Sequence, residues 1–328
     1  MSAFGRVLGT VVGHEQQIEV LVTKAKDSKL SHCVLLHGKS GVGKRLIAWG
    51  LAQEILCDSP KDGNACGFCP HCSKIQNHHH EAILEILPKN NRINVDEAKK
   101  VLEFVQLAKI GKARFVIIDG VEKMNPQTAN SLLKNLEEPA AGTFYFLITS
   151  SLKSVLQTIR SRSMQIQFSP LSGEQMRRVM PSAEDWMLEA GNGSVEKLKS
   201  LYSDEEKELR SNVCNLFNHL SSEHGYVKLL ELIQTLSKSS KEEFLRALAE
   251  IQNFIRDCLM VKKGYSAKFY QDQMELIEKC AILPEAHLFF FLQNCIEKEQ
   301  ELHLNTDQSL ILESLFLKFE KAYQNRKN

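Results

Sequence analysis

The stretch that decides the fold is Gly38-Lys39-Ser40-Gly41-Val42-Gly43-Lys44-Arg45. Its spacing matches the phosphate-binding loop G-x-x-x-x-G-K-[ST] at every fixed position except the last. An apolar run at 33–36 leads into it, and a helical pattern of apolar residues over 44–56 follows it. Glycines such as Gly38, Gly41 and Gly43 let backbone N–H groups turn toward a phosphate, and the helix start adds its positive dipole end. We therefore expect a nucleotide site in which Lys44 meets the outer phosphates.

The last position of the loop argues against catalysis at this site. A hydroxyl group there would coordinate Mg²⁺, but the chain has Arg45. A guanidinium group has only donors, so it cannot bind a metal ion. Asp119 ends a predicted strand at the carboxyl edge, where open α/β sheets bind ligands, and completes the candidate site. The sequence thus predicts an NTPase scaffold with a degenerate nucleotide site.

Length and composition set broad limits on the class of protein. The chain has 328 residues, enough for two or three domains, with 43% apolar and 25% charged residues, as in ordinary globular proteins. Its formal net charge of +1 gives no overall field that would select nucleic acid or a membrane, although a local basic patch stays compatible with it. No apolar run approaches the ~18 residues that span a bilayer, and residues 1–10 lack the apolar core of a signal peptide. We expect a cytoplasmic protein with no membrane partner, whose cysteines are reduced thiols or metal ligands.

Strand-like and helix-like segments alternate through the first half of the chain. Near-continuous apolar strands between helices are typical of a parallel sheet with helices on both faces. The predicted strands are 32–37, 82–87, 114–119, 143–149 and 164–168, and the predicted helices are 44–56, 95–109 and 126–137. The expected fold class of this part is α/β.

The composition changes near Ser169-Pro170-Leu171. Thirteen of the 17 glycines and six of the eight prolines lie in 1–173, and the rest of the chain is helical in period. We predict an α/β domain at 1–170, a short helical segment at 171–203 and an all-α region at 204–328. The expected helices of the last region include 226–238, 241–262, 284–302 and 308–324.

Four of the nine cysteines lie within sixteen residues. Cys57, Cys66, Cys69 and Cys72 form C-x₈-C-x₂-C-x₂-C, with turn-forming prolines and glycines between them. Four thiolates complete a tetrahedral Zn²⁺ shell with no open position, so the pattern predicts a structural zinc module at 57–72. Four unrelated thiols are the alternative, and nearby histidines are poorer ligands because four sulfurs saturate the ion. A zinc-bearing DNA-binding module is disfavoured, since 73–81 holds one lysine and no basic recognition helix.

The order of these features resembles the bacterial clamp-loader subunits of DNA polymerase III, AAA+ proteins of the gamma/tau and delta-prime types. The resemblance covers roughly the first 200 residues. Its most specific part is Asn130-Ser131-Leu132-Leu133-Lys134-Asn135-Leu136-Glu137-Glu138-Pro139, which is similar to the family's N-x-L-L-K-x-L-E-E-P segment. Thr158-Ile159-Arg160-Ser161-Arg162-Ser163 is similar to its T-I-x-S-R-C segment, with Ser163 in place of cysteine. The resemblance implies an AAA+ domain at 1–170, a lid domain at 171–203 and an oligomerising collar at 204–328.

Departures from the family's catalytic residues favour one type of subunit. An active gamma/tau ATPase has a hydroxyl after the loop lysine, an Asp-Glu pair ending the third strand and an arginine after Gly-Ser in the lid. This chain keeps Lys44 but has Arg45, Asp119-Gly120 and Glu196 at those places. The three losses resemble delta-prime, the stator that lacks independent ATPase activity. A catalytically active gamma/tau-type ATPase is the alternative, and turnover of ATP by the isolated chain would distinguish the two.

The resemblance also implies a role for Arg162. In the family the arginine of S-R-C reaches across a subunit interface, and such an arginine finger stabilises charge on the neighbour's γ-phosphate. Spacing alone favours a plain surface ion pair, and Arg160 is a second choice in the same segment. The implied partners are other clamp-loader subunits of gamma/tau and delta types, the sliding clamp and primed DNA. Whether nucleotide still binds the loop is left open.

Overall fold

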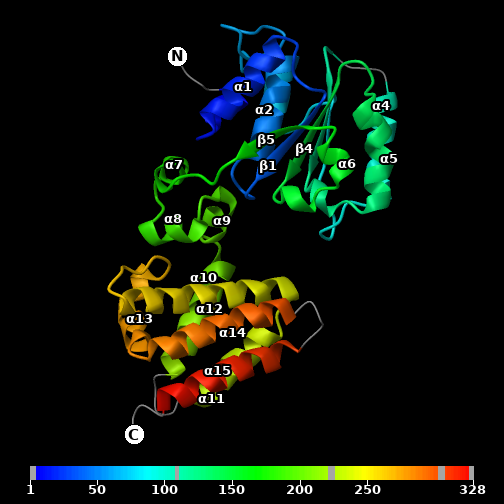
Figure 1. The fold of residues 1–328 in the computed structure, drawn as a ribbon. Helices are drawn as coiled ribbons and strands as arrows, with labels where there is room; N and C mark the ends of the chain where they lie inside the picture. Colours follow the sequence, from blue (N-terminus) through cyan, green and yellow to red (C-terminus); the bar gives the residue numbers. More distant parts are fainter. Residues whose placement is uncertain (1–4, 108–110, 221–225, 302–306, 325–328) are drawn as a thin grey trace. The chain divides into compact units, whose positions relative to one another are not determined.

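The computed structural model describes residues 5–107, 111–220, 226–301 and 307–324. The chain divides into two compact units (Figure 1). The first combines Met1–Ser182 with Asn192–Glu196, and the second combines Ala183–Gly191 with Lys197–Asn328. The α/β part and the mostly helical C-terminal part that the sequence predicts are both present.

The first unit is built on a five-stranded parallel sheet with the order β2-β3-β4-β1-β5. The strands are β1 Cys33–Gly38, β2 Ile83–Ile86, β3 Arg114–Asp119, β4 Thr143–Thr149 and β5 Met164–Phe168. All five predicted strands are confirmed, with ends that shift by at most one residue. β1 is an interior strand, because it pairs with β4 on one side and β5 on the other.

Both faces of this sheet are buried, which explains the near-continuous apolar strands. Side chains alternate between the faces, so Val34 and Leu36 of β1 join one apolar cluster and Leu35 joins the other. Helices α1 Glu15–Lys26 and α2 Lys44–Leu56 cover the first face (Figure 1). Helices α4 Val95–Gln106 and α5 Pro126–Glu137 cover the second.

Local sequence sets where these helices begin. Asn94 and Glu97 form a capping box at α4, and the Asn125 side chain accepts the backbone N–H of Thr128 at α5, where Pro126 is the first helical residue. The predicted helix 95–109 ends earlier, at Gln106, and residues 108–110 lie outside the described part. The other elements are η1 Val7–Thr10, α3 Pro70–Gln76, η2 Val121–Lys123, η3 Leu152–Ser154, α6 Gln157–Arg160 and α7 Gly173–Val179.

The C-terminal part is helical and has its own apolar core. Its elements are α8 Asp185–Gly191, α9 Val195–Ser200, α10 Asp204–Leu220, α11 Tyr226–Ser237, α12 Lys241–Lys262, η4 Gln271–Gln273, α13 Met274–Ala281, α14 Glu285–Glu301 and α15 Gln308–Gln324. Phe217 and Phe254 stack in the core with ring centroids 4.1 Å apart. The four helices predicted for this region are present with nearly the expected ends. Among the described residues, no helix has both the length and the apolar character to cross a membrane.

Candidate functional site

The loop between β1 and α2 adopts backbone conformations that favour glycine. Gly38, Gly41 and Gly43 have φ angles of 140°, 74° and 98°. A Cβ atom at Gly38 would lie 2.1 Å from the carbonyl oxygen of Phe168, and one at Gly41 would lie 2.2 Å from Oγ of Ser194. The three glycines of the motif therefore form a tight turn at the start of α2, as a phosphate-binding loop requires.

Lys44 is buried against its own loop. Its Nζ donates to the carbonyl oxygens of Gly38 and Lys39, at 2.6 Å in each case. Burial lowers the pKa of Lys44, while the nearby carboxylates, Asp119 foremost, raise it. Burial in turn raises the pKa of Asp119, and the charges of Lys44 and Arg45 lower it. The sequence-predicted lysine and aspartate thus share one electrostatic environment.

Arg45 is bound to a neighbouring strand. Its Nε and Nη2 donate to the two carboxylate oxygens of Glu85 on β2, at 2.6 Å in each case. Trp49 Nε1 donates to the same carboxylate at 2.9 Å. The hydrogen bond with Glu85 raises the pKa of Arg45. A forked arginine–carboxylate pair is geometrically specific, and it leaves no acceptor for Mg²⁺ at the position after Lys44.

Residues 192–196 contact the phosphate loop from the other side. The Val195 N–H donates to the Gly41 carbonyl oxygen at 2.9 Å, and Ser40 Oγ donates to Glu196 Oε2 at 3.0 Å. Glu196 therefore holds a carboxylate directly on the loop. Its negative charge opposes that of a phosphate at the same place.

The end of β3 has one carboxylate where an active ATPase of the family has two. Asp119 is followed by Gly120, whose φ is 79°. The next acid, Glu122, accepts hydrogen bonds from the N–H and Oγ of Ser150, at 3.2 and 2.7 Å. Burial raises the pKa of Glu122, but hydrogen bonds from Ser150, Thr149 and the backbone of Glu122 together lower it further, so the net shift is downward. Glu122 is thus engaged at the end of β4.

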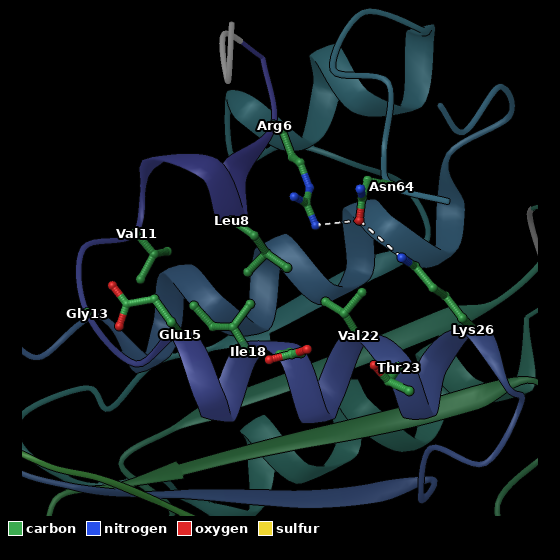
Figure 2. A pocket seen from close by; sticks show the side chains of 11 residues that line it. Arg6, Leu8, Val11, Gly13, Glu15, Ile18, Val22, Thr23, Lys26 and Asn64 are labelled. Carbon is green, nitrogen blue, oxygen red and sulfur yellow. Dashed lines mark hydrogen bonds between the residues drawn. The ribbon is translucent and has the colours of Figure 1, made fainter. Parts of the chain in front are cut away.

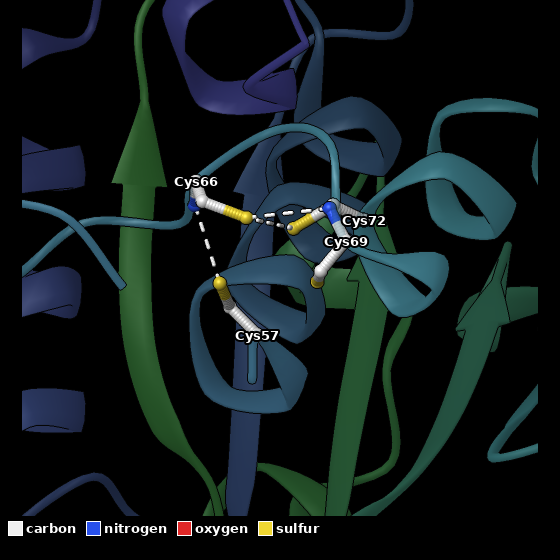
Figure 3. A group of neighbouring side chains, drawn as sticks. All are labelled: Cys57, Cys66, Cys69 and Cys72. Atoms are coloured by element: carbon white, nitrogen blue, oxygen red, sulfur yellow. Dashed lines mark hydrogen bonds between the residues drawn. The ribbon is translucent and has the colours of Figure 1, made fainter. Parts of the chain in front are cut away.

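The four cysteines predicted as metal ligands come together in space (Figure 3). Cys57 follows α2, Cys66 lies in the loop after it, Cys69 is the N-cap of α3, and Cys72 lies in the first turn of α3. Their Sγ atoms all lie within 4.8 Å of one another. Zn–S bonds of about 2.3 Å place tetrahedral sulfurs about 3.8 Å apart, so small shifts would let this cluster hold a metal ion.

Backbone N–H groups point at two of these sulfurs. The Cys66 N–H donates to Cys57 Sγ at 3.2 Å, and the Cys69 N–H donates to Cys66 Sγ at 3.4 Å. Burial raises the pKa of Cys66, but hydrogen bonds from the backbone of Phe68 and Cys69 and from neighbouring thiols lower it to about 6. Such bonds favour the thiolate, which is the metal-binding form.

The histidine beside the cluster has another partner. His71 Nδ1 lies 2.7 Å from His80 Nε2. Within the described part of the chain, the group of side chains able to share one metal ion consists of the four cysteines.

Arg162 lies on the segment after α6 and faces a different carboxylate. Its Nε and Nη2 bind Oε1 of Glu137, and its Nη1 donates to the Thr158 carbonyl oxygen at 3.0 Å. The Arg162 side chain is 36% exposed. Arg160 is the more buried arginine of the segment, which leaves Arg162 better placed to meet another molecule.

A pocket of about 390 Å³ opens beside α1 and is lined by none of the predicted site residues (Figure 2). Leu8, Ile18 and Val22 contribute apolar surface. Arg6 and Lys26 both donate to Asn64 Oδ1 at its rim, at 3.0 and 3.2 Å. The cationic groups of the pocket therefore already have an acceptor within the chain.

Sequence reasoning missed two carboxylates that hold the key arginines. Glu85, the partner of Arg45, is a charge inside the apolar run of a predicted strand, which was a usable signal. Glu137, the partner of Arg162, belongs to the long motif at 130–139, but nothing in that motif indicates what it contacts.

Comparison with known proteins adds an independent line of evidence on the class of protein. A family model described as the DNA polymerase III delta subunit matches residues 13–172. The delta-prime subunit of Pseudomonas aeruginosa is 34% identical over 195 residues, which span 56% of this chain and 59% of that protein. The delta-prime subunit of Bacillus subtilis is 27% identical over 320 residues, which span 93% of this chain and 95% of that protein. The tau subunit of Salmonella typhimurium is 30% identical, with coverage of 58% and 32%.

These matches, with the parallel sheet and its phosphate loop, support one class of protein, the clamp-loader subunits of DNA polymerase III. Within that family it groups with the delta-prime subunits, one of which aligns along nearly its whole length. The gamma/tau alternative is not favoured, because the family model and the relatives of 34% and 27% identity carry delta or delta-prime names.

Proposed function

We propose that the chain is a stator of a clamp loader, a subunit that does not turn over ATP itself and completes the ATP site of a neighbour. In this role it helps to load the sliding clamp on primed DNA, with gamma/tau and delta types of subunit as its direct partners. The observation that carries the proposal is the forked contact of Arg45 with Glu85. It fixes a cation where an active ATPase needs a metal ligand.

The internal contacts of the phosphate loop support a degenerate site. Lys44 donates two hydrogen bonds to carbonyl groups of its own loop, and the Ser40 hydroxyl donates to the Glu196 carboxylate. A nucleotide would have to replace these contacts and overcome the charge of Glu196 without a complete Mg²⁺ shell. The loop therefore serves as the folded start of α2 more than as a catalytic centre.

Arg162 is the residue that completes the ATP site of the neighbouring subunit. It is exposed and carries a planar cation that suits phosphate oxygens. An arginine finger donated by a neighbour stabilises the charge of a transferring phosphoryl group. A subunit with no chemistry of its own has use for such an arginine only at another subunit's site.

We also propose that the cysteine cluster binds one structural Zn²⁺. Four sulfur donors close the tetrahedral shell, so the ion would fasten the segment 57–72 and take no part in a reaction. The domain roles follow the same resemblance. We assign residues 171–203 to a lid and 204–328 to an oligomerising collar.

The test is reconstitution of the loader with partner subunits, a clamp and primed DNA. Arg162→Ala should leave assembly intact, because an exposed arginine contributes little to stability. It should reduce DNA-stimulated ATP turnover by the share of one site, where a lost finger costs about 10³-fold or more. Arg162→Lys should restore little, since a point charge does not reproduce the fork.

Arg178→Ala, a change at an exposed arginine of α7, is the matched control and should behave like the wild type. Wild-type clamp loading and ATP turnover by the Arg162→Ala assembly, across limiting ATP concentrations, would contradict the trans role.

A further inference from the structure

Glu137 occupies a fixed point at the end of α5. Leu132 and Leu136 of the same helix are buried in the core under the sheet. Pro139 follows two residues after the helix end, where it cannot continue the helical hydrogen bonding. α5 packs against α6, so the carboxylate of Glu137 is presented to the segment that carries Arg162.

The place of this carboxylate is unfavourable for the helix alone. The carboxyl end of a helix carries partial negative charge and is stabilised by cations. Glu137 adds a negative charge at that end, and the guanidinium of Arg162 offsets both charges. The acid is therefore explained by its contact with Arg162 better than by α5.

The backbone next to Arg162 is anchored on both sides. Ile159 is buried, and Ser163 Oγ donates to its carbonyl oxygen at 2.8 Å. Ser163 Oγ also lies 3.2 Å from Cys33 Sγ at the start of β1. With the backbone held, the orientation of the long Arg162 side chain is what remains to be set.

Glu137 and Thr158 set that orientation with part of the guanidinium. Nε and Nη2 bind the Glu137 carboxylate, and Nη1 binds the Thr158 carbonyl oxygen. Guanidinium has five N–H donors, two of them on each Nη atom. Nη1 also donates to Ser161 Oγ at 3.4 Å, so the second N–H of Nη2 is the donor left for an acceptor such as a phosphate oxygen.

We infer that Glu137 is a positioning residue, which holds Arg162 in one orientation before the neighbour's nucleotide arrives. The inference rests on the trans role proposed above. A free arginine would have to lose its rotamer freedom on reaching the phosphate, and a held one has already lost it. The effect belongs to the chemical step, because orientation of a catalytic group acts on the barrier.

The experiment uses the reconstituted loader with Glu137→Gln, a change that keeps shape and removes charge. DNA-stimulated ATP turnover at the site that Arg162 completes should fall by roughly tenfold, less than with Arg162→Ala. The decrease should appear in kcat, with the KM for ATP and the yield of assembled complex unchanged. A merely structural role would alter the yield or the unfolding temperature instead.

Two further variants make the test specific. Glu138→Gln removes a charge from the exposed neighbouring acid and should act like the wild type. Glu137→Gln added to Arg162→Ala should cause no further loss, because Glu137 acts through Arg162. Glu137→Asp keeps the charge but has a shorter side chain, so its kcat should lie between those of the wild type and Glu137→Gln. This variant keeps the test decisive if Glu137→Gln folds poorly.

The outcomes separate the two proposals. Unchanged turnover with Arg162→Ala would remove the trans role itself. A loss with Arg162→Ala but none, or a gain, with Glu137→Gln would overturn the positioning role alone. A further loss when the two changes are combined would show that Glu137 acts by another route, which also contradicts the inference.

Discussion

At the scale of single residues, two arginines have opposite consequences because of what they contact. The forked Glu85 contact ties Arg45 to strand β2 at the position where a Mg²⁺ ligand would be needed. The Glu137 contact leaves Arg162 on the surface, with one N–H of Nη2 still available. Residue chemistry predicted that Arg45 cannot bind Mg²⁺, but its partner lies 40 residues away, on strand β2. Only the order of strands in the sheet brings the two together.

Gly38 permits a direct test of the loop conformation. Gly38→Ala should lower the free energy of unfolding by about 2 kcal/mol or more, because it combines an unfavourable φ of 140° with a Cβ 2.1 Å from the Phe168 carbonyl oxygen. Urea unfolding followed by Trp49 fluorescence in a Trp186→Phe background would report on the first unit, where Trp49 is buried.

Gly173→Ala is the matched control for this change. A Cβ at Gly173 meets nothing within 4 Å, and Gly173 is the first residue of α7. Its effect should stay within about 1 kcal/mol and tend toward stabilisation. Equal unfolding midpoints for the two alanine variants would contradict the loop geometry.

At the scale of elements, the sequence predicted best where periodicity is strong. The five strands and helices α2, α5, α12 and α15 lie where their apolar patterns put them. α3 was not predicted, because seven residues beginning at Pro70 are too few to show a period. The cysteine spacing predicted the cluster but not helix α3. A metal site requires only that the four sulfurs meet, whatever elements lie between them.

The cysteine cluster yields the element-scale prediction. Metal analysis of the purified chain should find close to one zinc per molecule. Replacing Cys66 and Cys69 together with serine should remove it, because two hydroxyls do not replace two thiolates at this ion. The segment 57–76, including α3, should then become sensitive to protease, since formation of such a site is coupled to local folding.

Cys214→Ser, a change in α10 outside the cluster, should retain the metal. Full zinc content in the Cys66/Cys69 double variant would refute the assignment of these ligands.

At the scale of the whole molecule, the proposed function depends on the catalytic groups that the nucleotide site of this chain lacks. The sequence showed three departures at the nucleotide site and one retained arginine, and from these the type of subunit could be predicted. It could not show that Ser40, Gly41 and Lys44 are already engaged within the chain. Lys44 bonds within its own loop, but the contacts of Ser40 and Gly41 join segments some 150 residues apart, which no local pattern encodes.

The isolated chain should therefore hydrolyse ATP far more slowly than a working subunit. In the proposed function, Arg45 stands where a metal ligand is needed and Gly120 stands where an active subunit has the acid that orients the attacking water. Mg²⁺ and that acid supply much of the positioning and charge stabilisation in phosphoryl transfer, so losing both should cost several orders of magnitude. A steady-state assay with Mg²⁺ should find turnover well below ~1 s⁻¹.

Lys44→Ala is the control, because residual activity that survives it comes from a contaminating enzyme. Turnover near ~1 s⁻¹ that needs Mg²⁺ and disappears in Lys44→Ala would instead identify a motor subunit, and Arg162 would then serve a chain with chemistry of its own.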